Sequence, residues 1–213
     1  MAKSETDLAA LLCSRLCHDL LSPVGALSNG LELLADEKDP AMRQRCFELL
    51  EQSAKTSTDK LRFFRLAFGA AGGYGDEVDV AEPRQVIEAL AGNNARLELN
   101  WTIPGATLPK PAVKLLLNLA AIAIEALPRG GTIDIGAEMR DGACEIVVRA
   151  AGGRIAFDPK VGQALDGTLP EGELSSKSAP AHMLRLLAGE AGGGLQYHLS
   201  DEALVMGAVL PQG

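Results

Sequence analysis

Residues 1–71 carry a hydrophobic pattern with helical spacing and no strand-like alternation. Apolar and thiol side chains recur at steps of four and three residues, at Cys13, Cys17, Leu20, Val24, Leu27, Leu31 and Leu34. These steps place the side chains on one face of a helix, as a seam in a left-handed bundle. The polar segment 35–40 interrupts the pattern, with Pro40 suited to the first turn of a new helix. A second run of apolar positions ends at Phe68, so the sequence predicts a helical hairpin.

The expected length of this hairpin bears on its oligomeric state. Two helices of roughly 30 residues extend about 45 Å each and bury only one face against each other. A second copy of the chain would cover the apolar stripe left in water and form a four-helix bundle around a two-fold axis. The sequence therefore predicts a homodimer.

Beyond the glycine-rich segment 69–75 the pattern changes to shorter elements separated by turn residues. The predicted strands are 77–80, 96–103, 131–139, 143–150, 194–200 and 203–211, and the predicted helices are 84–92, 110–127, 158–165 and 179–191. Asp141-Gly142 and Asp201-Glu202 mark the turns of two hairpins. Helices and strands that mix without regular alternation predict an α/β sandwich with helices on one sheet face. The expected fold class is α+β, with a hairpin domain at 1–71 and an α/β domain at 76–213.

Composition and charge narrow the range of partners. The 213 residues are 47% hydrophobic and 23% charged, which is ordinary for a soluble globular protein. A net charge of −8 without a basic patch argues against nucleic acid. No apolar stretch reaches the roughly 18 residues of a membrane span, and the N-terminus lacks a signal-peptide pattern. The four cysteines make no metal pattern, so we expect a reduced protein. Because the chain has neither a membrane span nor a signal peptide, we also expect it to be cytoplasmic and to have no membrane partner.

The most reactive candidate is His18, one of three histidines in the chain. It falls one residue past the seam and should point outward, where an imidazole is a capable nucleophile. Its neighbours at helical offsets are Leu11, Ser14, Arg15, Leu21, Ser22 and Gly25. Several of these residues are small and allow another protein to approach closely, while Leu21 suits a docking contact. An ordinary exposed histidine is the alternative on periodicity alone.

Two further residues bear on His18. Asp19 is adjacent and is suited to orient the ring or to accept its proton, although adjacent helical side chains diverge and the contact needs a specific rotamer. Pro23 removes one helical hydrogen bond and frees the carbonyl of Asp19, so a local kink is expected beside the histidine.

The segment HDLLSPVGAL at 18–27 resembles the phospho-acceptor box of sensor histidine kinases. His18 takes the phosphorylated position, Asp19 the acidic one, Ser22 the polar one and Pro23 the proline. The second half resembles the ATP-binding domain of that family in the order of its elements, so the resemblance covers nearly the whole chain. It implies a dimeric hairpin that presents the histidine.

The chain departs from these kinases at three nucleotide-binding features. Asn118 matches the first asparagine of the family's asparagine-rich helix, but Ile122 replaces the second, which helps to hold magnesium. Ala150 replaces the aspartate that recognises adenine, and Ser178 and Pro180 replace glycines of the phosphate loop. Pro180 has no N–H to offer a phosphate. Together these departures imply that this chain binds no ATP, no metal and no other cofactor.

A kinase-like dimer with an acceptor histidine and no nucleotide site is similar to the ChpT-type histidine phosphotransferase family. The resemblance implies a relay from a receiver aspartate of a hybrid kinase to His18, then to response regulators. In that family CckA is the donor, CtrA and CpdR are acceptors, and the receiver domains bring Mg²⁺. A divergent kinase that autophosphorylates and a non-catalytic dimeric scaffold are the alternatives. Ser22 matches a position tied to phosphatase activity, so hydrolysis of the phosphohistidine stays open.

Overall fold

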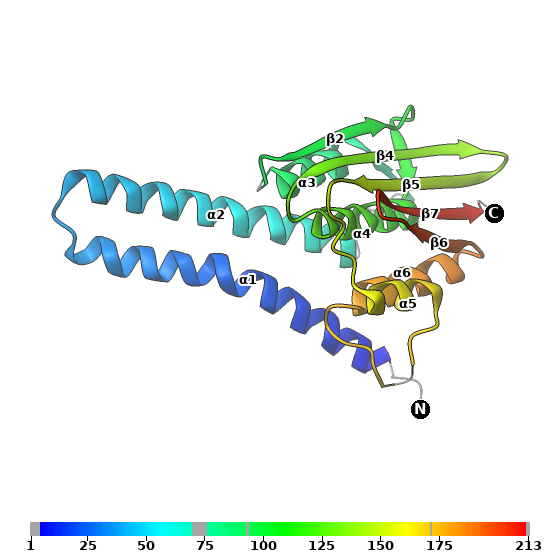
Figure 1. The fold of residues 1–213 in the computed structure, drawn as a ribbon, viewed down its shortest axis with the longest axis horizontal. Helices are drawn as coiled ribbons and strands as arrows, with labels where there is room; N and C mark the ends of the chain where they lie inside the picture. The colour runs from blue at the N-terminus through cyan, green and yellow to red at the C-terminus, as the bar shows by residue number, and fades with distance from the viewer. Residues whose placement is uncertain (1–4, 70–75, 93, 171, 212–213) are drawn as a thin grey trace.

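A computed structural model describes residues 5–69, 76–92, 94–170 and 172–211 (Figure 1). The helices in these ranges are α1 (Glu5–Asp36), α2 (Pro40–Phe68), α3 (Ala81–Ala91), α4 (Lys110–Ala126), α5 (Pro159–Asp166) and α6 (Ala179–Glu190). The strands are β1 (Glu77–Asp79), β2 (Leu97–Thr102), β3 (Thr107–Pro109), β4 (Gly131–Arg140), β5 (Ala143–Ala151), β6 (Gly194–Leu199) and β7 (Ala203–Pro211). Every predicted element is confirmed.

The long helices α1 and α2 run antiparallel and extend away from the sheet as a hairpin (Figure 1). Pro40 occupies the first turn of α2, and the side chain of Asp39 caps the helix by accepting a hydrogen bond of 3.2 Å from the Ala41 amide. At the same end Arg43 donates to the carbonyls of Leu34 (3.0 Å) and Glu37 (2.8 Å). These bonds satisfy carbonyls that the end of α1 leaves open, and they confirm the predicted break between the helices.

The apolar seam predicted on α1 divides into two stripes. The stripe that faces α2 contains the buried Pro23 and Gly30, and a Cβ on Gly30 would lie 2.9 Å from Leu50 Cδ2. By contrast, Val24 is 48% exposed and Leu31 is 59% exposed. Cys13 and Cys17 are also exposed in the single chain. The prediction merged the stripes because proline and glycine do not count as apolar, although their small or rigid side chains permit the close approach of two helices.

The main sheet has the order β2-β4-β5-β7-β6, in which only the β2–β4 pair is parallel. Both predicted hairpin turns are present in the sheet. Asp141 and Gly142 adopt positive φ angles of 49° and 77°, as a two-residue turn of this kind requires. The short strand β3, which pairs with β1 in a separate ladder, was not predicted.

Helices cover one face of this sheet, as expected for the α/β sandwich (Figure 1). The central helix α4 contributes the fully buried Leu115, Leu116, Leu117 and Leu119. Phe63, Phe64 and Leu66 at the end of α2 belong to the same hydrophobic core. The α+β class is therefore confirmed, and the end of the hairpin shares its core with the sheet and its helices. Residues 70–75 of the predicted glycine-rich joint lie outside the described residues, and the two-domain division stays a prediction.

Candidate functional site

His18 lies in the middle of α1 with its side chain 83% exposed, as its position beside the seam predicts. Its Nδ1 atom lies 3.2 Å from Asp19 Oδ1. A carboxylate can only accept a hydrogen bond, so this contact places the ring proton on Nδ1. Nε2 has no hydrogen-bond partner among the described residues. In the neutral imidazole this tautomer leaves Nε2 as the nitrogen with the free lone pair, on a side chain that is exposed to solvent.

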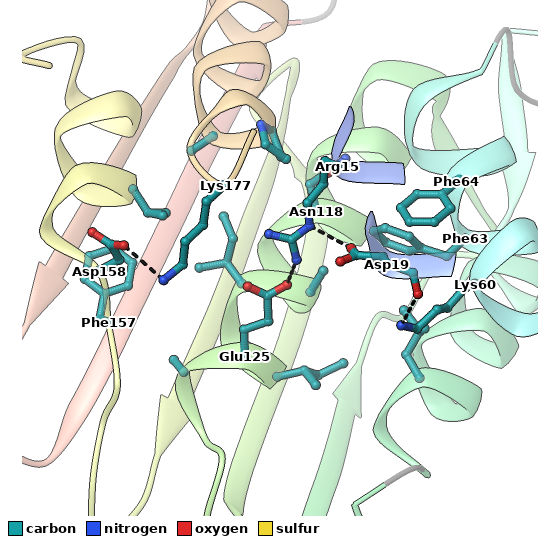
Figure 2. Close-up of a pocket in the computed structure, with 18 of the residues that line it drawn as sticks. Arg15, Asp19, Lys60, Phe63, Phe64, Asn118, Glu125, Phe157, Asp158 and Lys177 are labelled. Atoms are coloured by element: carbon teal, nitrogen blue, oxygen red, sulfur yellow. Dashed lines mark hydrogen bonds and ion pairs between the residues drawn. The ribbon is translucent and has the colours of Figure 1, made fainter. Parts of the chain in front are cut away.

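Arg15 holds the other side of the Asp19 carboxylate and is itself paired with Glu125 (Figure 2). Arg15 Nε donates to Asp19 Oδ2 at 2.6 Å, and a terminal nitrogen of the same guanidinium pairs with Glu125 Oε1 on α4. Burial lowers the pKa of Arg15, but the two carboxylates outweigh this effect and the pKa lies above its usual value. Asp19 is thus fixed between a permanently charged guanidinium and the imidazole.

Pro23 creates the third contact of Asp19. Because Pro23 has no N–H, the helix cannot supply a donor to the Asp19 carbonyl, as the sequence predicts. Lys60 of α2 donates to this oxygen instead, at 2.7 Å (Figure 2). The lysine therefore binds the two helices together next to the histidine.

A cavity of about 320 Å³ lies between the hairpin and the helices that cover the sheet (Figure 2). Arg15, Asp19 and Lys60 line its hairpin side, and Glu125 lines the side formed by α4. The remaining lining is largely apolar and includes Phe63, Phe64, Phe68, Ile122, Phe157 and Pro180. Charged groups of the hairpin thus face the region that resembles a nucleotide pocket.

The positions matched to nucleotide-binding residues have other contacts here. The Asn118 amide donates to the Lys114 carbonyl of its own helix at 2.9 Å, while Ile122 and Pro180 line the cavity. Ala150 is fully buried in β5. Ser178, which is also buried, has its hydroxyl 3.2 Å from that of Ser175.

Among the residues that line the cavity, Lys177 also pairs with Asp158 at 3.0 Å (Figure 2). The hydrogen bond from Lys177 and that from the Lys160 amide lower the pKa of Asp158. Both charges are therefore already paired within this chain.

The residues expected around His18 differ in their exposure. Ser14, Leu21 and Ser22 are exposed, with Leu21 at 73%, whereas Leu11 and Gly25 are partly buried. Arg15 is only 18% exposed, so its expected place on the outer surface is wrong. Its long side chain turns inward because Asp19 and Glu125 both attract it.

Sequence reasoning missed the roles of Lys60 and Glu125 in this network. Lys60 is 41 residues from Asp19, and Glu125 is 110 residues from Arg15. The signal that could have pointed to Glu125 is that it is the one carboxylate on the largely apolar helix α4.

Within the described ranges, no group of three or more His, Cys, Asp or Glu side chains is arranged to hold a metal ion. No helix in that part of the chain combines the length and apolar character that crossing a bilayer requires.

A long hairpin with an exposed, carboxylate-oriented histidine, attached to a sheet with helices on one face, is an α+β arrangement suited to carrying a phosphoryl group on histidine. A family model described as "Histidine phosphotransferase C-terminal domain" matches residues 80–203. The chain belongs to the histidine phosphotransferase family.

Comparisons with individual proteins support the assignment to this family. The chain is 37% identical to the protein phosphotransferase ChpT of Brucella abortus (strain 2308) over 205 residues, which is 96% of each protein. A solved structure described as a bacterial phosphotransferase is 36% identical, has a TM-score of 0.85 and covers 98% of both chains. The structure of full-length ShkA in complex with AMPPNP shares only the fold, at 18% identity and a TM-score of 0.50, over 98% of this chain and 46% of that one. The resemblance to ChpT-type proteins is confirmed.

Proposed function

We propose that this protein transfers phosphoryl groups between receiver-domain aspartates through His18, in a two-component phosphorelay and without ATP. The observation that carries the proposal is the exposed imidazole whose Nδ1 is turned toward Asp19, so that Nε2 is free to react. Family membership supports phosphotransfer itself.

The proposed reaction needs only a presented nucleophile and a phosphorylated partner. Nε2 of His18 attacks the phosphorus of an aspartyl phosphate, a P–N bond forms, and the P–O bond to the partner's carboxylate breaks. Asp19 accepts the hydrogen bond from Nδ1–H and stabilises the positive charge that develops on the ring. Attack by the carboxylate of a second receiver on the phosphohistidine reverses these bond changes. Phosphohistidine and acyl phosphate have similar transfer potentials, so neither direction needs another energy source.

The positions matched to nucleotide-binding residues support the ATP-independent form of the proposal because the side chains found there do not fit a magnesium nucleotide. Asn118 keeps the position of the family's first asparagine, but Ile122, where the second asparagine would help to hold magnesium, offers no oxygen to a metal. Ala150 has no carboxylate for an adenine, and Pro180 has no amide for a phosphate at the start of α6. We therefore propose that the Mg²⁺ needed for transfer is held by the receiver domain.

Exposed apolar residues on the hairpin support the proposed homodimer. Large hydrophobic side chains on α1 and α2 with more than two-fifths of their surface exposed are Leu21, Val24, Leu31, Leu33, Met42, Phe47, Leu49 and Leu61. So many exposed hydrophobic side chains on one pair of helices are typical of a protein interface rather than of a solvated surface. A four-helix bundle with a second copy would bury most of them.

Receiver domains are the proposed partners of the surface around His18. The exposed Ser14, Leu21 and Ser22 and the partly buried Leu11 and Gly25 form this surface. Following the resemblance, we propose a CckA-like receiver as donor and CtrA-like and CpdR-like receivers as acceptors. Arg15 is excluded from the surface because it is turned inward.

One labelling experiment tests the proposal. The protein is incubated either with labelled ATP alone or with a hybrid-kinase receiver that carries labelled phosphate on its aspartate. Label should appear only from the receiver, be lost in His18→Ala, and persist in the matched control His198→Ala, which removes another exposed histidine. Label from ATP alone would establish the autophosphorylating alternative. Absence of label from every receiver would leave the scaffold alternative.

A further inference from the structure

We infer that Arg15 and Glu125 are positioning residues for the histidine: Glu125 on α4 orients Arg15, and Arg15 fixes the Asp19 carboxylate that holds His18 Nδ1–H. This inference rests on the proposed role of His18 as the phosphoryl carrier. It assigns to the second half of the chain a part in phosphotransfer that needs no nucleotide.

The contacts form a continuous series from α4 to the imidazole of His18, and Figure 2 shows the part from Glu125 to Asp19. Glu125 Oε1 accepts from a terminal nitrogen of Arg15, and Arg15 Nε donates to Asp19 Oδ2 at 2.6 Å. Asp19 Oδ1 then accepts from His18 Nδ1 at 3.2 Å. Each group uses a different atom for each neighbour, so the contacts do not compete.

The planar guanidinium of Arg15 fixes the geometry of this series of contacts. Its donors are fixed in one plane, so a guanidinium that binds Glu125 at one edge presents Nε to Asp19 in a defined orientation. Asp19 needs such a constraint because side chains of adjacent helical residues diverge. With Oδ2 held by Arg15, Oδ1 is left for the imidazole. Lys60 fixes the backbone of Asp19 through its carbonyl and completes the support.

Burial separates the support from the reacting group. The side chains of Arg15 and Asp19, which form the central ion pair, are 18% and 19% exposed, whereas Glu125 is 51% exposed and His18 is 83% exposed. Partial burial strengthens the ion pair, while the imidazole remains open to a partner. The hydrogen bond made by one ring nitrogen decides which nitrogen carries the proton. Loss of Glu125 should therefore release Arg15 and loosen the Asp19 carboxylate. The imidazole could then populate the tautomer that carries its proton on Nε2, and in that tautomer Nε2 has no free lone pair with which to attack phosphorus.

The test measures the tautomer of His18 in the isolated protein and the transfer rate with a receiver. In wild-type protein labelled with ¹⁵N, the imidazole shifts of His18 should report Nδ1–H as the main neutral tautomer. Glu125→Gln and Arg15→Lys should raise the Nε2–H population. The single-turnover rate at saturating phosphorylated receiver should fall between about 10- and 100-fold, with the half-saturating receiver concentration unchanged. Glu98→Gln, which neutralises an exposed carboxylate on β2, is the matched control and should behave as wild type.

The outcomes separate this inference from the proposed function. Unchanged tautomer populations and rates in both variants, with His18 still labelled, would overturn the positioning role and leave the phosphotransfer proposal intact. A wild-type protein that accepts no phosphoryl group would overturn the proposed function, whereas the tautomer measurement would still decide the positioning role. Circular dichroism and urea unfolding identify a purely structural effect, since that would lower stability without changing the tautomer or the rate. That result would also overturn the inference.

Discussion

Replacing Lys60 by methionine removes the donor that Pro23 makes necessary. Lys60 Nζ donates to the Asp19 carbonyl at 2.7 Å in a partly buried setting. Methionine keeps an unbranched stem of similar length, so the change removes the ammonium group with little loss of packing. Pro23 cannot supply an alternative donor, and the carbonyl would lose its partner.

The expected cost follows from the chemistry of this bond. A hydrogen bond from a charged donor contributes about 1.5–3 kcal/mol, and a buried carbonyl without a partner costs about 1–3 kcal/mol. Because the site is only partly buried, water satisfies some of the lost bonding. We therefore expect Lys60→Met to lower the free energy of unfolding by about 1.5–2.5 kcal/mol.

A double-mutant cycle with Pro23→Ala isolates the cause. Alanine at this position restores an N–H that can bond the carbonyl four residues back, that of Asp19. In the Pro23→Ala background, Lys60→Met should then cost less than about 1 kcal/mol. Urea unfolding of the four proteins at one fixed protein concentration measures the cycle, and the packing change caused by Pro23→Ala cancels in it. Equal costs in both backgrounds, within about 0.5 kcal/mol, would refute the reasoning.

Three other features give shorter predictions. Cys144 is buried with its pKa raised to about 11, so iodoacetamide at pH 8 should spare Cys144 in the folded protein and modify it after urea unfolding, as mass spectrometry can verify; equal modification in both states would contradict this. Burial lowers the pKa of His182 below its usual 6.5, so its contribution to stability is present above about pH 6.5 and lost as pH falls through the folded pKa. Urea unfolding of His182→Gln should show a weaker loss of stability on acidification than wild type, and an identical pH dependence would speak against the burial effect. Gly131 has a φ of 144°, and a Cβ there would lie 2.2 Å from the Ala151 carbonyl oxygen, so Gly131→Ala should cost about 2 kcal/mol or more in thermal unfolding. Gly153→Ala, at an open position, should cost far less, and equal costs would show that the close contact is not the cause.

Hydrophobic periodicity was sufficient for most of the fold because each long element carries its own signal. The helices α1, α2 and α4 repeat their apolar positions over many turns, and the two-residue turn at Asp141-Gly142 has a local conformational cause. The strand β3 was missed because its three residues end in Pro109 and run directly into α4, so no strand-like pattern separates them from the helix. Its pairing with β1 places Leu108 beside Val78, a contact that no local pattern encodes.

In the candidate site, too, the local features were predictable from the sequence, whereas the contacts between distant segments were not. His18, Asp19 and Pro23 lie within six positions of one another, so helix geometry alone gave the outward ring and the open carbonyl. The partners that complete the site, Lys60 and Glu125, come from other helices and are brought close only by tertiary packing. The direction of long side chains such as Arg15 is set by those partners and not by helical offset.

The shared hydrophobic core determines how the role of the second half must be tested. Deleting residues 76–213 and assaying transfer is the direct experiment, but Phe63, Phe64 and Leu66 of α2 are only 7%, 6% and 1% exposed within the core that this deletion removes. Each exposed side chain would cost about 1.5–3 kcal/mol, so the truncated hairpin would lose activity through unfolding alone. Glu125→Gln instead removes one charge at the rim of the cavity and leaves this core intact. A slower transfer in that variant, with unchanged stability, would therefore assign to α4 a direct part in orienting the histidine.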